Sequence, residues 1–289
     1  MRADLKGEGI LLAKIGFRSA RATLLALLSA AALACASLSP ASAAPNTPSA
    51  ATIAKANHKI LAYQTAHPDD LAGLEALSFK YTGIKMRVSL NGVKGLLTGA
   101  QAQPYIDRAK KQTTRANTLM SGGIPAYSLR VYTVALMGPP PRIRVVGNWT
   151  FPDWWAGQAP PVDVASIGMS SIPTCMHQQD YGQLTWEYDN TVTNVAWLAS
   201  ANLGNNAPYW DVADKEDNRG AAMARSGNVG LTLANYCGTT QSMAATFNYA
   251  ANQGGSIVSV SASYGGLSVG YSSPGLTREE GTAPVYFNN

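Results

Sequence analysis

The sequence predicts an α+β protein, in which a small helical N-terminal region is followed by a mainly antiparallel β-sandwich. Residues 49–119 show helical periodicity broken by one short strand, whereas strand-like alternation dominates from Ala126 onward. Residues 226–277 contain no Lys, Arg, Asp, Glu or His, and they alternate Ser, Thr, Asn and Gly with Val, Leu, Ala and Tyr. Such alternation is typical of strands with one apolar face and one face of hydroxyls and amides.

Residues 1–43 are expected to be a secretion signal, which makes the protein secreted and extracellular. Basic residues precede the apolar run 24–34, which is shorter than the ~20 residues that a membrane-spanning helix needs. Ala41-Ser42-Ala43 offers the small side chains of a cleavage site. A lipid anchor at Cys35 is the less favoured alternative, because Ala32 stands where such motifs usually have Leu.

The two parts of the remaining chain carry opposite net charge. Residues 44–144 hold 13 basic and 4 acidic side chains, whereas residues 145–289 hold 4 basic and 11 acidic ones. We therefore expect a basic helical region with one hairpin at 44–123 and an antiparallel β domain with one disulfide at 124–289. The opposite charges favour packing of the two parts on one another, and an arm for an acidic envelope polymer is the alternative interpretation of the basic region. The same region is also a candidate pro-segment that is removed after export.

Three helices are expected in the basic region, over 49–66, 69–80 and 102–119. Pro68-Asp69-Asp70 is a helix start, because Pro suits the first turn and carboxylates are favoured by the helix dipole. Between the second and third helices, Lys85 and Arg87 alternate with apolar residues, and Asn91-Gly92 follows them. That dipeptide between strand-like segments predicts a hairpin.

Strands are expected over 127–136, 142–151, 183–189, 229–236 and 242–249, and short helices over 193–203 and 219–225. The clearest element is a hairpin over 256–273. A turn at Gly265-Gly266 would pair Ala262 with Val269 on an apolar face and Ser263 with Ser268 on a hydroxyl face. Because strands of membrane barrels alternate in the same way, a membrane-acting toxin is one function hypothesis, although such strands need ~9–11 residues.

Cys175 and Cys237 are the two cysteines that follow the signal, and we expect them to form a disulfide. Cys237 has the strand parity of Val229 and Leu231, so its sulfur should point into the core. The alternative makes Cys175 a nucleophile with His177 as its base. An oxidising compartment argues against a free thiol there.

All six tryptophans lie within residues 149–210, together with five carboxylates. Aromatic rings stack on the C–H faces of sugars, and carboxylates and amides bind sugar hydroxyls. We therefore expect a ligand-binding surface for an extracellular glycan or cell-envelope polymer, made by Trp149, Asp153, Trp154 and Trp155. The alternative is that the tryptophans build the β core, as we expect for Trp186.

The favoured function is non-catalytic binding, with no cofactor, no bound metal, no nucleic-acid partner and no stable membrane insertion. The alternative is a secreted hydrolase that uses Asp153, Asp180, Glu187 and Asp189. Glu187 and Asp189 would lie about 7 Å apart on one strand face, which is compatible with inverting glycoside hydrolysis. An i,i+2 carboxylate pair is also what a solvated strand face carries.

His67-Pro68-Asp69-Asp70 resembles the metal-binding motif of zinc-dependent de-N-acetylases, over a short stretch that includes Ile60-Leu61-Ala62. In that family the His and the second Asp hold zinc and the first Asp is the base. The family also needs a strand before the motif, where this chain has helical periodicity, and a further His motif, for which His177 alone remains downstream. Too few ligands are left for a zinc site, so a helix start is the simpler interpretation.

Overall fold

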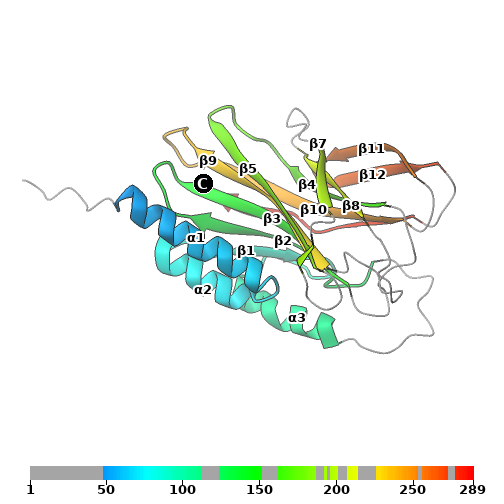
Figure 1. The fold of residues 1–289 in the computed structure, drawn as a ribbon, viewed down its shortest axis with the longest axis horizontal. Coiled ribbons are helices and arrows are strands. Elements are labelled where there is room, and N and C mark those ends of the chain that lie inside the picture. Colours follow the sequence, from blue (N-terminus) through cyan, green and yellow to red (C-terminus); the bar gives the residue numbers. More distant parts are fainter. Residues whose placement is uncertain are drawn as a thin grey trace, which may run out of the picture. The chain divides into compact units, whose positions relative to one another are not determined.

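The computed structural model places three helices on one side of two packed β-sheets and a separate hairpin on the other side (Figure 1). It describes residues 48–111, 124–151, 162–186, 192–193, 196–200, 207–213, 226–252, 256–272 and 277–289. Within these segments strands predominate and pair antiparallel. The predicted fold class, an α+β protein with a mainly antiparallel β-sandwich, is confirmed.

The helices are α1 (Ala50–Ala66), α2 (Leu71–Thr82) and α3 (Gly99–Lys111). Asp70 caps α2 by accepting a 2.8 Å hydrogen bond from the backbone N–H of Gly73, so the predicted helix start is confirmed. Gly83 ends the same helix with a φ of 68°, a conformation that glycine adopts without strain. The third helix begins three residues before its predicted start, and residues 112–119 of that prediction lie outside the described residues.

The first sheet has the strand order β1-β2-β3-β9-β5-β6. Its strands are β1 (Arg87–Leu90), β2 (Leu129–Leu136), β3 (Arg142–Thr150), β5 (Met176–Trp186), β6 (Val192–Thr193) and β9 (Ser226–Asn235). The strands predicted at 127–136, 142–151 and 229–236 are thus confirmed. The strand predicted at 183–189 is the last part of a longer strand, and residues 187–189 lie outside the described ones.

The second sheet has the order β13-β10-β4-β8-β7, and β14 pairs with the first part of β10. Its strands are β4 (Val162–Met169), β7 (Ala196–Ser200), β8 (Tyr209–Ala213), β10 (Ser242–Asn252), β13 (Thr277–Gly281) and β14 (Val285–Asn288). The prediction of a helix over 193–203 is wrong, because residues 196–200 pair with β8 as an edge strand. Sheet pairing overrides local helix propensity there. The helix predicted over 219–225 lies outside the described residues.

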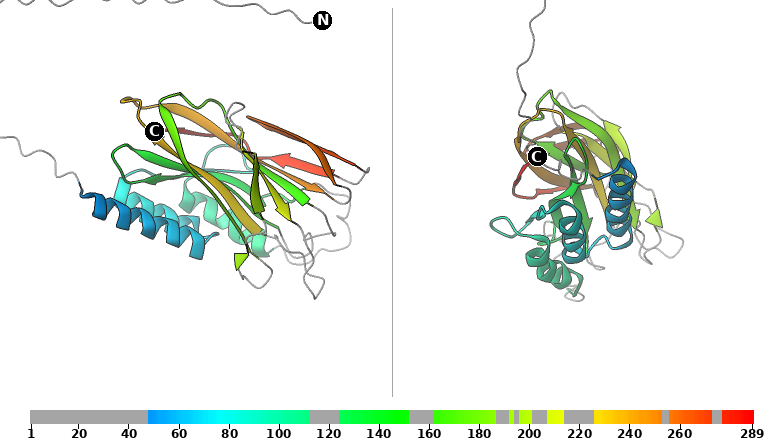
Figure 2. Two further views of the ribbon diagram at one scale, coloured as in Figure 1. Left: turned by 45° about the horizontal axis from the view of Figure 1, so that its top comes forward. Right: turned by 90° about the vertical axis from the view of Figure 1, so that its left-hand side faces the viewer.

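Alternation along the strands produces four layers (Figure 2). Leu129 and Val131 of β2 point toward the second sheet and join the central core, while Tyr132 and Val134 of the same strand pack under the helices. Every residue of β2 is therefore buried. On the second sheet, Val164 lies on the outer face and packs against the hairpin. No helix in the described part of the chain combines the length and apolarity needed to cross a membrane.

The hairpin consists of β11 (Ile257–Ser263) and β12 (Gly266–Tyr271) and forms a two-stranded sheet of its own. Its predicted register is wrong by two residues: Ala262 pairs with Leu267, and Val260 pairs with Val269. The turn is Tyr264-Gly265 instead of Gly265-Gly266, because Gly265 alone of these residues has a positive φ, 77°. A shift of two residues preserves the faces, so the predicted apolar and hydroxyl sides are correct.

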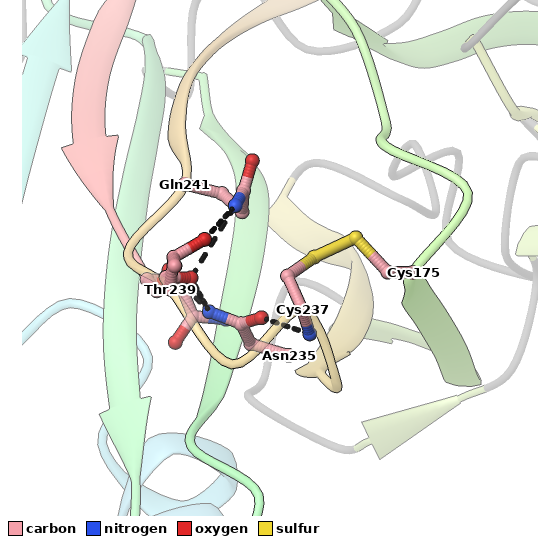
Figure 3. Close-up of a disulfide and its surroundings, with 6 residues drawn as sticks. Cys175, Asn235, Cys237, Thr239 and Gln241 are labelled. Carbon is pink, nitrogen blue, oxygen red and sulfur yellow. Dashed lines mark hydrogen bonds between the residues drawn. A yellow bond between two sulfur atoms is a disulfide. The ribbon is translucent and has the colours of Figure 1, made fainter.

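The disulfide between Cys175 and Cys237 is present and ties together the ends of two paired strands (Figure 3). Cys175 immediately precedes β5 and Cys237 follows β9 by two residues, next to the Met176–Asn235 pair of the ladder. Asn235 accepts a 2.8 Å hydrogen bond from the backbone N–H of Cys237. The alternative of a nucleophilic Cys175 is therefore wrong, because its sulfur is covalently occupied.

The turn predicted at Asn91-Gly92 is present, but the hairpin around it is reduced to a single antiparallel bridge between Val88 and Leu97. Asn91 is buried, and its side chain forms a hydrogen bond to the start of β2. Its side-chain oxygen accepts from the backbone N–H of Leu129 at 2.9 Å. The segment after β1 is thereby held against the start of β2. The predicted division at residue 123 falls between two strands of one sheet, since β1 pairs with β2 along its whole length.

Candidate functional site

The zinc-like motif has a structural explanation. Asp69 is paired with the fully buried Arg130 of β2 and with Lys110 of α3. Asp70 caps α2 and also accepts from the hydroxyl of Tyr63 on α1. Both carboxylates are therefore occupied in joining the helices to one another and to the sheet. Among the described residues no group of three potential ligands from His, Cys, Asp or Glu gathers in one place.

The predicted aromatic surface is not found at Trp149. This side chain has 0% exposure and lies between the two sheets, where its ring stacks on Phe247 at a centroid distance of 6.3 Å. Its assignment as a ligand-binding residue is therefore wrong, because no face of the ring is open to solvent. Trp210 is equally buried. Asp153, Trp154 and Trp155 lie outside the described residues.

The carboxylates proposed for a hydrolase are only partly located. The backbone of Asp180 lies in β5 opposite Thr232, which in turn pairs with Arg144 of β3. Asp153, Glu187 and Asp189 lie outside the described residues. The grouping of these four carboxylates as a site therefore stays a prediction.

A pocket of about 650 Å³ opens instead at the edge of the sandwich where β14 faces β1 and β2. One wall comes from residues 84–87 and from β2 and β3, and the other from β14 and the start of β10. Tyr264, in the turn of the hairpin, also lines the pocket. The volume falls in the range that small-molecule sites occupy, about 300–1,000 Å³.

The pocket has an apolar base and a polar rim. Its lining includes the buried side chains of Ile143, Met243 and Phe287, which belong to the central core. Two tyrosines on the rim remain open to solvent, Tyr286 with 59% and Tyr264 with 38% exposure. Hydroxyl and amide groups complete the lining, including the Ser242 hydroxyl, which donates to the side-chain oxygen of Asn288 at 2.9 Å.

The two tyrosines contact each other. Burial raises the pKa of the Tyr264 hydroxyl, and the neighbouring Tyr286, to which it hydrogen-bonds, raises that pKa further. Tyr264 therefore stays protonated at neutral pH and can donate as well as accept. Two amphipathic aromatic groups from different elements thus face the same cavity.

Sequence reasoning missed this site because its lining comes from segments widely separated along the chain. One signal was visible: Lys85 and Arg87 alternate with buried Met86 and Val88, which places both cations on one face. What that face meets depends on the return of β14 at the end of the chain. Periodicity within a segment carries no information about such a pairing.

Comparison with known proteins gives little further guidance. No protein-family model matches the chain, and no curated protein matches it. Among solved structures, a chain described as "Pore forming protein" is similar over 56% of this chain and 85% of its own length, with 7% identity and a TM-score of 0.28.

Proposed function

We propose that the protein is an exported, non-catalytic binding protein whose ligand is an extracellular glycan or cell-envelope polymer. The pocket lined by Tyr264 and Tyr286 is its binding site. The observation that carries this proposal is the meeting of two solvent-exposed tyrosines over one pocket of about 650 Å³. The disulfide fits an extracellular location.

Glycan recognition is favoured by the chemistry of the lining. Tyrosine rings present flat apolar faces to the C–H faces of a sugar, and their hydroxyls bind its polar groups. Ser242 and Asn288 add a hydroxyl and an amide beside them. A polymer suits the site because the pocket lies between edge strands and its two tyrosines are exposed, so a chain can continue beyond the bound unit.

A catalytic role is less favoured because the described lining contains no Asp, Glu or His. Glycoside hydrolysis ordinarily needs a pair of carboxyl groups across the scissile bond. The tyrosine hydroxyl of Tyr264, with its raised pKa, is a poor base at neutral pH. The site therefore offers binding groups without an acid–base pair.

The test is depletion of the purified protein from solution by a panel of insoluble glycans and cell envelopes, with the supernatant assayed for released sugars. Tyr264→Ala and Tyr286→Ala should each weaken retention by about tenfold, the loss expected for a stacked ring. Tyr236→Ala is the matched control, because Tyr236 has 53% exposure and does not line the pocket. Retention that depends on Trp154 and Trp155 but on neither pocket tyrosine would reject the site, and released sugar would indicate a hydrolase.

Membrane action by the hairpin is the second candidate, and one observation favours it. The hairpin is not part of either large sheet, and its apolar side packs through Leu267 and Val269 while Ser259, Ser261 and Ser268 face solvent. Against it, the two strands have 7 and 6 residues, shorter than the ~9–11 of a membrane strand.

Dye release from liposomes separates this candidate from pocket binding. If the hairpin enters lipid, Val269→Asp should abolish release, because it places a charge on the apolar face. Ser268→Asp, on the hydroxyl face, should retain it. Absence of dye release by the wild-type protein over a range of lipid compositions would remove the candidate.

A further inference from the structure

We infer that the pocket selects an acidic glycan, whose carboxylate, sulfate or phosphate groups bind at Lys85 and Arg87. The inference rests on the proposed function and names the ligand class of the same site. Both cations line the pocket, and both are exposed on either side of the buried Met86. They therefore project from the same side of the chain into the space that the tyrosines face.

The charge of the lining has one sign. Lys85 and Arg87 make no ion pair with any residue that the structure describes. The other wall, although it comes from the acidic part of the chain, contributes neutral groups: Ser170, Ser242, Asn288 and the two tyrosines. A cleft with low-dielectric walls and one sign of charge concentrates oppositely charged ligands.

The two walls of the pocket carry different groups, cations on one and tyrosines on the other, and each wall would bind a different part of the ligand. Arg87 offers a planar guanidinium that binds carboxylate or sulfate oxygens through two parallel N–H donors, and Lys85 adds a mobile point charge. The tyrosines on the opposite side take the ring of the sugar. An uncharged sugar would leave both cations without a partner, so the acidic form should bind more tightly.

The test compares three soluble polymers by equilibrium binding: dextran sulfate, alginate and uncharged dextran. Dextran and its sulfate share a backbone, and alginate carries carboxylates, so the set separates the type of anion from the sugar. We expect the double variant Lys85→Gln/Arg87→Gln to bind at least one acidic polymer about tenfold more weakly than the wild-type protein. The matched control is Lys55→Gln/Lys59→Gln, which removes the same charge from exposed positions on α1.

The inference is supported if affinity for an acidic polymer falls in the pocket variant, stays within twofold in the control, and declines with added salt as expected for a Debye length of about 10 Å at 0.1 M. It is overturned if both double variants lose affinity equally, since general attraction then explains the binding. Equal affinity of the wild-type protein for dextran and dextran sulfate also overturns the inference. The proposed glycan site still stands in that case if Tyr264→Ala and Tyr286→Ala bind these polymers more weakly than the wild-type protein. The inference is overturned as well if the wild-type protein binds neither acidic polymer, or binds only vesicles of anionic phospholipid.

Discussion

Arg130 has 0% exposure, and its guanidinium is bonded to the carboxylate of Asp69. The same carboxylate accepts from the hydroxyl of Thr150 at 3.1 Å and pairs with Lys110. The Nε and Nη1 atoms of Arg130 have no hydrogen-bond partner. Its Nη2 atom also donates to the hydroxyl of Thr150 at 3.2 Å, but that group is neutral. The buried cation therefore depends on the carboxylate of Asp69 for charge compensation.

Asp69→Asn should therefore lower the free energy of unfolding by about 3–5 kcal/mol at pH 7, the cost of leaving a buried charge uncompensated. Urea denaturation of the wild-type protein and the variant measures this difference in unfolding free energy. Asp107→Asn, at an exposed position of α3, is the control and should change stability by less than about 1 kcal/mol. Equal stability of the Asp69 variant and the wild-type protein would show that Arg130 is solvated.

The effect should depend on pH in a defined direction. Burial raises the pKa of Asp69, but the charges of Arg130 and Lys110, together with hydrogen bonds from Lys110 and Thr150, lower it by more. The folded-state pKa therefore lies below the ordinary value. The ion pair then contributes stability that is fully present above the unfolded pKa of about 3.9 and is lost as the pH falls through the folded pKa. The difference between wild type and Asp69→Asn should shrink below about pH 4. A difference that stays constant down to pH 2 would contradict this assignment.

Gly147 illustrates a requirement for space in the central core. A Cβ at this position would lie 2.0 Å from the ring of Phe247, which stacks on Trp149. Gly147→Ala should cost about 1–3 kcal/mol of unfolding free energy through overpacking. Phe247→Leu should relieve part of that cost, so a double-mutant cycle should show coupling between the two positions; additive effects would mean that the core adjusts elsewhere.

At the scale of elements, the helices pack against β1 and β2 of the first sheet through one shared apolar layer. Ile60 of α1 and Leu74 of α2 pack with Val88 of β1 and with Tyr132 and Val134 of β2. All five side chains have at most 1% exposure. The layer therefore depends on residues from both sides of the predicted division at 123.

Deleting residues 1–123 should leave a β fragment that does not fold as a stable monomer, because the outer face of β2 would be exposed. The comparison is with a variant that begins at residue 48 and retains the whole compact unit. Size-exclusion chromatography and binding of an apolar dye report the outcome. A monomeric, cooperatively folded 124–289 fragment would support the pro-segment interpretation instead.

The disulfide joins positions 62 residues apart. Replacing both cysteines by serine should lower the free energy of unfolding by about 4 kcal/mol on the chain-entropy model. Reduction of the wild-type protein should have the same effect, and reduction of the double variant should have none. Unchanged stability of the double variant would indicate that the β5–β9 ladder alone holds these strand ends.

Elements were predictable where the signal is local. Asp70 and Gly83 mark the two ends of α2 through capping chemistry that lies within a few residues. The register of the hairpin could not be predicted in this way. A turn at Tyr264-Gly265 and a turn at Gly265-Gly266 place the same side chains on each face, and they differ only in which residue takes the positive φ. The edge strand β7 was mistaken for a helix because its pairing with β8 is a tertiary event.

At the scale of the whole molecule, the pocket joins all the layers except the helices themselves. Tyr264 belongs to the hairpin turn, and the neighbouring Gly265 N–H donates to the hydroxyl of Thr246 on β10 at 3.0 Å. The backbone at the turn also lies against Gly168 of β4, where an added Cβ would be 2.3 Å from the Ser263 carbonyl oxygen. The position of one pocket wall is thus set by how the hairpin docks. The core tryptophans were visible in the sequence as large apolar residues, but their burial depends on sheet packing that no local pattern specifies.

Thr246→Val should loosen the hairpin turn and weaken ligand binding, although Thr246 does not line the pocket. We expect faster amide exchange at residues 263–266 and about fivefold weaker binding, equivalent to one net hydrogen bond. Ser261→Ala, on the exposed face of the hairpin, is the control. Faster exchange with unchanged affinity would show that the hairpin and the pocket are independent.

The most direct test of the account is hydrogen–deuterium exchange of the protein with and without a polymer that depletes it from solution. The account predicts protection in the peptides that line the pocket, those covering residues 84–97, 242–245, 264–267 and 285–289. It predicts no protection at residues 152–160, which contain Trp154 and Trp155. Protection from exchange that is confined to residues 152–160 would contradict the pocket as the binding site. It would indicate that the polymer binds the segment with Trp154 and Trp155 instead.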